Sequence, residues 1–289
     1  MVPSSRYAVG TLTLHLVDRS RTIQLADGQR IPRELTTIVR YPALGAAGLD
    51  RPSAIPARGD GPFPLIVFGH GFDVGPGLYA RLLRYWTSAG FVVAAPIFPR
   101  ENPAAPGGPD ESDLPNQPAD MSFVISSLLA AARRTSGPLS GLINPHEIAV
   151  AGQSDGGDTA LAVAYDPPYR DPRVGAAVIL SGAEIPMLPS FTIAPGGPPL
   201  LATQGTADDI NPPAATEAFF DPAPPPKFLL WLLGAGHLPP YSTNRAQLRI
   251  VERVTTAFLQ RYLEHRGGAL ATLERAGDVP GLARLDQDP

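Results

Sequence analysis

Apolar runs and amphipathic segments alternate along most of this chain. Six runs are almost continuously apolar, which is typical of strands buried on both faces of a sheet. They lie at residues 63–68, 91–98, 147–151, 174–181, 200–204 and 228–233. Ahead of them, residues 11–17 alternate apolar and polar side chains, and residues 35–41 are rich in β-branched ones. These two segments predict an antiparallel pair, and the whole pattern predicts eight strands.

Segments with helical spacing fill most of the gaps between these strands. One of them opens with a proline, repeats apolar side chains three and four positions apart, and closes on two arginines. Helices are predicted at about residues 78–89, 118–134, 156–165 and 244–265. Strands that alternate with helices favour an α/β domain with a mostly parallel sheet flanked by helices.

The 289 residues are predicted to form one domain, residues 1–289. We place its core at about residues 7–265 and expect residues 267–289 to be a loosely held C-terminal tail. The connection at residues 182–199 is short, so that we expect no large helical lid.

Composition disfavours several other classes of protein. The formal net charge is −4, which attracts neither nucleic acid nor an anionic membrane surface. No apolar run approaches the roughly 18 residues of a membrane span, and the absence of cysteine leaves no disulfide or thiolate metal site. The first residues lack the apolar core of a signal peptide, which leaves a cytoplasmic protein or the mature form of a secreted one. The oligomeric state stays open.

The motif G-x-S-x-G at residues 152–156 is the strongest chemical signal. It directly follows an apolar run, so that a strand would lead straight into a helix. The serine of such a turn lies on strained backbone with other main chain very close, and the two glycines avoid a clash. Ser154 is therefore the candidate nucleophile, provided that an acid and a base follow it.

His237 is the candidate base among the five histidines of the chain. It ends a Gly-Ala-Gly-His turn after an apolar run, and imidazole suits proton transfer near neutral pH. Asp208, in a turn after the preceding apolar run, is the candidate acid. Asp209 is a competitor for that role and Glu184 a weaker one.

The predicted strand at residues 63–68 ends in a loop with the sequence F-G-H-G-F. Acyl transfer develops an oxyanion that needs preorganised donors. We expect these donors to be the backbone N–H groups of Phe72, after the turn at Gly71, and of Asp155, directly after the nucleophile. We expect His70 to pack the loop rather than to act in catalysis.

Together these motifs resemble those of the α/β-hydrolase superfamily over roughly residues 7–265. They are F-G-H-G-F at 68–72, G-Q-S-D-G-G at 152–157, G-T-A-D-D-I-N-P at 205–212 and G-A-G-H at 234–237. The chain is similar to bacterial dienelactone hydrolases, platelet-activating-factor acetylhydrolases and cutinase-like polyester hydrolases. The resemblance implies the α/β-hydrolase fold and a carboxylic ester hydrolase without a cofactor, and it assigns the acid to Asp208 rather than Asp209. The chain departs from dienelactone hydrolases in having serine where they have cysteine, and from secreted polyester hydrolases in lacking cysteines for a C-terminal disulfide.

We therefore expect a serine esterase that acts through an acyl-enzyme intermediate on neutral, accessible esters, either small molecules or polymers. A peptidase or amidase with the same triad is the alternative enzyme, and a hydrolase-fold binding protein is the non-enzymatic alternative. The complete triad argues against a binding protein. No metal is expected. The acidic segment at residues 110–113 could hold a cation, but we expect a solvated loop there.

Overall fold

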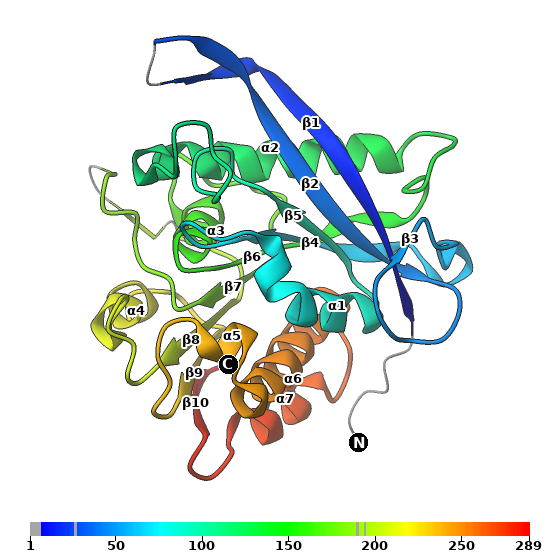
Figure 1. The fold of residues 1–289 in the computed structure, drawn as a ribbon. Coiled ribbons are helices and arrows are strands. Elements are labelled where there is room, and N and C mark those ends of the chain that lie inside the picture. Colours follow the sequence, from blue (N-terminus) through cyan, green and yellow to red (C-terminus); the bar gives the residue numbers. More distant parts are fainter. Residues whose placement is uncertain (1–6, 26–27, 189–190, 194) are drawn as a thin grey trace.

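A sheet of ten strands with helices on both faces forms the body of the described chain (Figure 1). The structure is a computed structural model that describes residues 7–25, 28–188, 191–193 and 195–289. The strands are β1 (Ala8–Gln24), β2 (Arg30–Ala43), β3 (Arg51–Pro52), β4 (Phe63–Gly69), β5 (Val92–Pro96), β6 (Ile143–Gln153), β7 (Ala176–Leu180), β8 (Leu200–Gly205), β9 (Lys227–Leu232) and β10 (Ala283–Asp288). They lie in the order β10-β9-β8-β7-β6-β4-β5-β2-β1-β3.

The strands from β4 to β9 run parallel to one another at the centre of the sheet. Every residue of β4, β5, β7 and β8 is buried, because helices cover both faces. This double burial explains why these strands are apolar without alternation. The predicted mostly parallel α/β sheet is confirmed, and each of the eight predicted strands is present.

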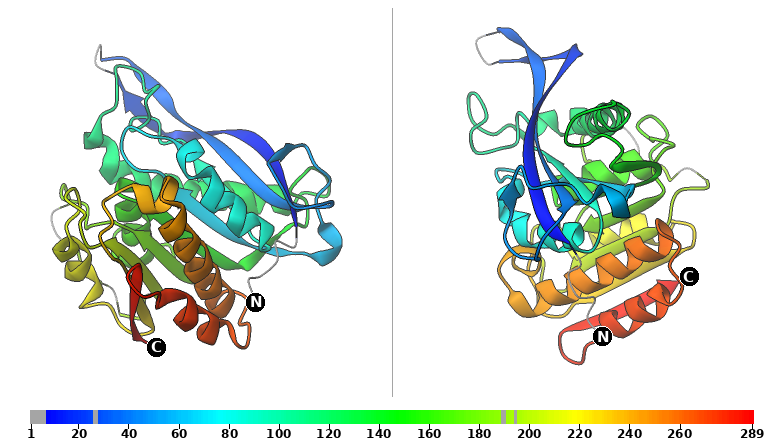
Figure 2. Two further views of the ribbon diagram at one scale, coloured as in Figure 1. Left: turned by 60° about the horizontal axis from the view of Figure 1, so that its bottom comes forward. Right: turned by 90° about the vertical axis from the view of Figure 1, so that its right-hand side faces the viewer.

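Helices cover both faces of the sheet (Figure 2). They are α1 (Ala80–Ser88), α2 (Gln117–Ala132), α3 (Asp155–Tyr165), α4 (Pro213–Phe220), α5 (Pro239–Ser242), α6 (Arg245–Tyr262) and α7 (Ala269–Gly277). Trp86 of α1 and Phe258 of α6 belong to the apolar core on one face, whereas Val124 of α2 and Leu161 of α3 belong to the core on the other. The four predicted helices correspond to α1, α2, α3 and α6.

The antiparallel hairpin of β1 and β2 extends past the rest of the sheet (Figure 1). The two strands have 17 and 14 residues, more than the sequence pattern predicts. Arg33 of β2 is buried, with Nη2 2.6 Å from Asp113 Oδ2 and Nε 2.6 Å from Asp120 Oδ1. Removal of one partner would leave an uncompensated buried charge, so this cluster fixes the hairpin to α2 and the segment before it.

The prediction that residues 267–289 form a loosely held C-terminal tail is wrong. Residues 269–277 form α7, which packs on α6, and β10 pairs antiparallel with β9. Leu285 is buried in the core, and Trp231 Nε1 donates a hydrogen bond to Asp286 Oδ2 at 2.8 Å. The segment therefore completes one edge of the sheet and belongs to the folded domain.

The connection between β7 and β8 contains no helix in its described residues, 181–188, 191–193 and 195–199. Residues 189, 190 and 194 of the predicted short connection lie outside the described residues. The described part thus holds no large helical lid, in agreement with the prediction. None of the helices in the described chain has the length and apolar character needed to cross a membrane.

Candidate active site

Ser154 lies at the sharp turn between β6 and α3, with φ 55° and ψ −131°. A positive φ is strained for a residue with a side chain, and such strain is typical of functional turns. A Cβ on Gly152 would lie 1.9 Å from the carbonyl oxygen of Gly156, and a Cβ on Gly156 would lie 2.2 Å from that of Gly69. Strand and helix approach too closely here for any other residue. The strand–turn–helix context predicted for the motif is therefore confirmed.

Ser154, His237 and Asp208 meet at the carboxyl ends of β6, β9 and β8. Ser154 Oγ lies 2.8 Å from His237 Nε2, and His237 Nδ1 lies 2.9 Å from Asp208 Oδ2 and 3.1 Å from Oδ1. The imidazole thus bridges a hydroxyl and a carboxylate with one nitrogen each. This is the geometry in which a base can take the hydroxyl proton while an acid orients the ring.

The carboxyl of Asp208 is almost fully buried, at 4% exposed. Its Oδ1 accepts the backbone N–H groups of Ile210 at 3.1 Å and Asn211 at 3.0 Å. Burial alone would raise the pKa of Asp208, but the hydrogen bonds from His237 and from the Asn211 backbone bring that pKa below its usual value. Asp208 is therefore held as a carboxylate beside the imidazole.

Neither competitor for the acid contacts the imidazole. Asp209 is exposed in the same turn, and Glu184 is half-buried in the connection after β7. In the described chain, the carboxylate hydrogen-bonded to His237 Nδ1 is that of Asp208. The geometry therefore favours Asp208, as the sequence resemblance implied.

The loop after β4 passes directly beside the nucleophile. A Cβ on Gly71 would lie 3.1 Å from Cβ of Ser154, tighter than ordinary packing, so that glycine lets the loop come close. The N–H of Phe72 meets no acceptor in the part of the chain that the structure describes. Asp155 opens α3, where the first N–H groups have no intrahelical partner. These two amides stay our predicted donors to the oxyanion.

His70 is fully buried and occupied by backbone groups. Its Nδ1 donates to the carbonyl of Gly71 at 2.8 Å, its Nε2 accepts the N–H of Phe98 at 2.9 Å, and its ring packs on that of Phe98. Burial lowers the pKa of His70 to about 4, which keeps the ring neutral. These contacts agree with the expected packing role, since both ring nitrogens hold the loop in place.

Sequence reasoning missed Gln153, the residue before the nucleophile. Its Nε2 lies 3.2 Å from His237 Nε2 and 3.3 Å from the His237 carbonyl, and its Oε1 accepts the Tyr79 hydroxyl at 2.6 Å. The same hydroxyl accepts the N–H of Gly71 at 3.4 Å. Gln153 and Tyr79 therefore link the imidazole to the loop beside the nucleophile. The only signal in the sequence is a polar residue at the variable position of the motif.

A buried carboxyl group lies next to the candidate nucleophile, and a second one lies beside the first. Asp155, 8% exposed, has Oδ1 3.5 Å from Ser154 Oγ, and Glu101, fully buried, follows β5. Burial raises the pKa of Asp155 to about 6, and burial together with the charge of Asp155 raises the pKa of Glu101 to about 9. The sequence predicted the carboxylate of Asp155 beside the candidate nucleophile as well as its amide, but it gave no signal for Glu101, which lies in an irregular loop.

The acidic segment at residues 110–113 is not a solvated loop throughout, which corrects the expectation. Asp113 is buried against Arg33, and Asp110 Oδ2 lies 2.7 Å from Arg100 Nη2. Among the described residues, no group of three or more histidine, aspartate or glutamate side chains has the arrangement of a metal site. Both acidic side chains are instead neutralised by arginines.

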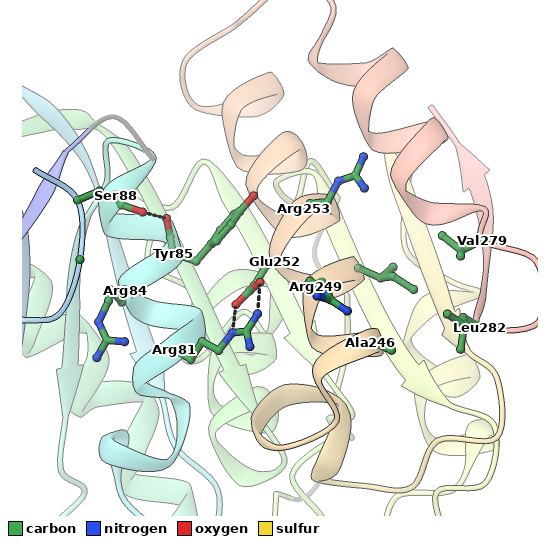
Figure 3. A pocket seen from close by; sticks show the side chains of 13 residues that line it. Arg81, Arg84, Tyr85, Ser88, Ala246, Arg249, Glu252, Arg253, Val279 and Leu282 are labelled. Atoms are coloured by element: carbon green, nitrogen blue, oxygen red, sulfur yellow. Dashed lines mark hydrogen bonds and ion pairs between the residues drawn. The ribbon is translucent and has the colours of Figure 1, made fainter. Parts of the chain in front are cut away.

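A cavity of about 830 Å³ lies between α1 and α6, away from the triad (Figure 3). Arg81 on its wall pairs with the buried Glu252 at 2.8 Å, and Arg253 and Tyr85 line it further along the two helices. None of the triad residues contributes to this wall. The cavity is therefore separate from the candidate active site.

Comparisons with known proteins bear on the fold and on the type of reaction. Residues 52–168, less than half of the chain, match the model of the chlorophyllase family. The matched segment includes Ser154 and Phe72 and ends before Asp208 and His237. No curated protein sequence is similar enough to the chain to count as a match.

A ferulic acid esterase from Streptomyces cinnamoneus is among the solved structures with a similar fold. It is 24% identical to the chain, the alignment covers 96% of this chain and 95% of that one, and the TM-score is 0.69. This neighbour shows that the fold is that of an α/β-hydrolase, and the family match supports an ester hydrolase. The chain is an esterase with the α/β-hydrolase fold.

Proposed function

We propose that the protein hydrolyses carboxylic esters with Ser154 as nucleophile, His237 as general base and acid, and Asp208 as the orienting carboxylate. One observation carries the proposal: the continuous hydrogen-bonded row from Ser154 Oγ through the imidazole to Asp208, with distances of 2.8 and 2.9 Å. A row of these three groups on a strained elbow has no evident structural purpose, since strain is retained where function requires it.

In the first half of the reaction, His237 Nε2 takes the proton of Ser154 Oγ as the oxygen attacks the ester carbonyl. The carbonyl oxygen becomes an oxyanion, for which the amides of Phe72 and Asp155 are the proposed donors. The bond to the alcohol oxygen then breaks, and the imidazolium returns its proton to that oxygen. The alcohol leaves, and the acyl group stays on Ser154 as an ester.

In the second half, His237 takes a proton from water, and the resulting hydroxide attacks the acyl carbon. The bond between that carbon and Ser154 Oγ breaks, and the imidazolium returns the proton to Oγ. The products are the carboxylic acid and the free enzyme. Asp208 stabilises the imidazolium in both halves and itself stays ionised, in keeping with its lowered pKa.

We assign neutral, accessible esters to this site, as small molecules or as polymers. Two features support the assignment. The described residues between β7 and β8 provide no helical cover that would enclose a long acyl chain. The carboxyl of Asp155 lies 3.5 Å from the nucleophile in a buried setting, where a negative charge is poorly screened.

A matched pair of substrates tests the proposed bond specificity. A nitrophenyl ester of a short acid should be hydrolysed, and the nitroanilide of the same acid should be hydrolysed at least about 10³-fold more slowly in kcat/KM, since the amine is a far poorer leaving group. Ser154→Ala serves as the blank for both substrates. Comparable kcat/KM values would instead assign the triad to an amidase or peptidase.

Discrimination against anionic esters is expected to depend on Asp155. Wild-type enzyme should prefer a neutral ester to the half-ester of a dicarboxylic acid, and Asp155→Asn should narrow this ratio of kcat/KM about 3- to 10-fold. The ratio is informative because a general loss of kcat in the variant affects both substrates alike. An unchanged ratio in the variant would remove Asp155 from substrate choice.

A further inference from the structure

Glu101 and Asp155 form a buried pair of carboxyl groups with too few donors. Glu101 is 0% exposed, and neither of its oxygens makes a hydrogen bond of ordinary geometry with the described residues, although the Gln117 amide lies near enough to lower its pKa. Oδ2 of Asp155 has no hydrogen-bond partner among the described residues either. The two carboxyls lie within hydrogen-bonding reach of each other. Two ionised carboxylates cannot form that bond, because neither has a hydrogen to donate. One proton shared between them satisfies both groups and removes one buried charge.

The main chain of Glu101 makes a second connection to the active site. Its carbonyl oxygen accepts the N–H of Asp73 at 2.9 Å. Asp73 has φ 52° and directly follows Phe72, whose amide is one proposed oxyanion donor. Asp155 carries the other proposed donor on its own backbone. The side chain of Glu101 therefore contacts Asp155, whose own amide is one proposed donor. The carbonyl of Glu101 contacts Asp73, the residue next to the other proposed donor, Phe72.

We propose that Glu101 is a positioning residue of the oxyanion hole, and that a proton shared with Asp155 holds the two donor peptides at a fixed separation. The inference rests on the proposed function, because it assigns a purpose to donors that belong to that mechanism. Without the proton, two negative charges would face each other in a buried site and push the two peptides apart. A displacement of about 1 Å can cost on the order of 10²-fold in rate.

The surroundings favour retention of the proton near neutral pH. Burial raises the pKa of both carboxyls, most strongly that of Glu101, and the Gln117 amide opposes the shift at Glu101 only in part. The charged and titratable groups that face the pair are Asp113 and Glu111 from the segment before α2, Asp158 from α3, Tyr79 before α1, and His237 after β9. The nearby acids disfavour a second negative charge, and a protonated His237 favours ionised Asp155.

The sign of the pH effect follows from these shifts. A general base acts only in its neutral form, so that the rate first increases with pH, whereas at higher pH the pair loses its shared proton and the rate decreases. The wild type should therefore show a bell-shaped profile of kcat against pH. Its alkaline limb should fall by up to about tenfold for each pH unit above the apparent pKa of the pair.

Glu101→Gln tests the proposal with a group that cannot lose a proton. Its amide N–H donates permanently to the Asp155 carboxylate, so that kcat at about pH 7 should stay within about threefold of the wild type and the alkaline limb should disappear. Glu101→Ala removes the donor altogether and should lower kcat about 10- to 100-fold across the profile, with KM little changed. The rescue by glutamine but not by alanine is a result that a purely space-filling role would not produce.

Glu111→Gln is the matched control, because it removes one nearby negative charge at an exposed position outside the pair. It should keep the alkaline limb and move it to lower pH by no more than a fraction of a pH unit, because one charge that disfavours ionisation of the pair has been removed. An alkaline limb that persists unchanged in Glu101→Gln would overturn the proposal. So would a kcat of Glu101→Ala equal to that of the wild type at every pH.

Thermal unfolding separates this proposal from the proposed function. Carboxyls whose pKa is raised on folding stabilise the fold at low pH, and that stability is lost as pH rises through the raised pKa. The Tm of the wild type should therefore decline between about pH 6 and pH 9, and that of Glu101→Gln should decline less. This readout needs no activity. A flattened Tm profile in a chain without Ser154-dependent hydrolysis would sink the proposed function but keep the proton-sharing pair, whereas identical Tm profiles would sink the pair.

Discussion

Ser154→Ala should lower kcat for ester hydrolysis by about 10⁵- to 10⁶-fold, to a residual rate set by the oxyanion donors and substrate binding. The reason is that no other hydroxyl in the described chain is bonded to His237 Nε2. Without Oγ the acyl-enzyme cannot form. Initial rates on a nitrophenyl ester, with the uncatalysed rate subtracted, measure the loss.

The fold should survive this change. Alanine fits wherever serine does, and the backbone strain at φ 55° is the same for both residues. The Tm of Ser154→Ala should therefore lie within a few degrees of the wild type, or above it, since functional strain and polarity are often costly to stability. Ser126→Ala, at an exposed serine of α2, is the matched control and should keep full activity. Equal losses of esterase activity in Ser154→Ala and Ser126→Ala would point to an unspecific effect of the substitution.

Asp208→Asn should cost on the order of 10⁴ in kcat, and Asp209→Asn should cost less than about twofold. Asparagine at 208 keeps the shape of the side chain but loses its charge. The imidazolium then lacks its counter-charge, and the amide can bind the wrong tautomer of His237. Asp209 is exposed and lies outside the row of hydrogen bonds, so that its charge is largely screened.

The comparison between Asp208→Asn and Asp209→Asn is informative because the two substitutions are chemically identical and lie one residue apart. A larger loss in Asp209→Asn would reassign the acid. If both variants were nearly fully active, Glu184→Gln would be the next variant to assay. Unfolding curves for all three keep a loss of activity distinct from a loss of structure.

Local signals were enough to predict the turn that carries the candidate nucleophile and the central sheet. The turn at Ser154 depends on contacts of Gly152 and Gly156 that any strand–elbow–helix would make, so that the motif carries its own geometry. Doubly buried strands such as β4 and β7 are apolar along their whole length, which needs no knowledge of their neighbours. The order of acid and base after the elbow completed the prediction.

Residues that depend on distant partners could not be predicted in this way. β10 is mostly exposed and has a polar sequence, and it becomes a strand because β9 offers an open edge and Leu285 a place in the core. Glu101 stands in an irregular loop and reaches Asp155 only in the folded chain. Likewise, the contact between Gln153 and Tyr79 joins residues that are 74 positions apart. No local pattern marks any of these contacts.

Covalent labelling with a serine-directed fluorophosphonate tests the central claim most directly. The reagent forms a bond between phosphorus and the oxygen of an activated serine and releases fluoride, so that the adduct marks the nucleophile itself. Peptide mapping by mass spectrometry should find one adduct, on Ser154, formed in step with the loss of esterase activity and absent from Ser154→Ala. An adduct on another residue that accompanies inactivation, or full inactivation of Ser154→Ala by the same reagent, would contradict the account.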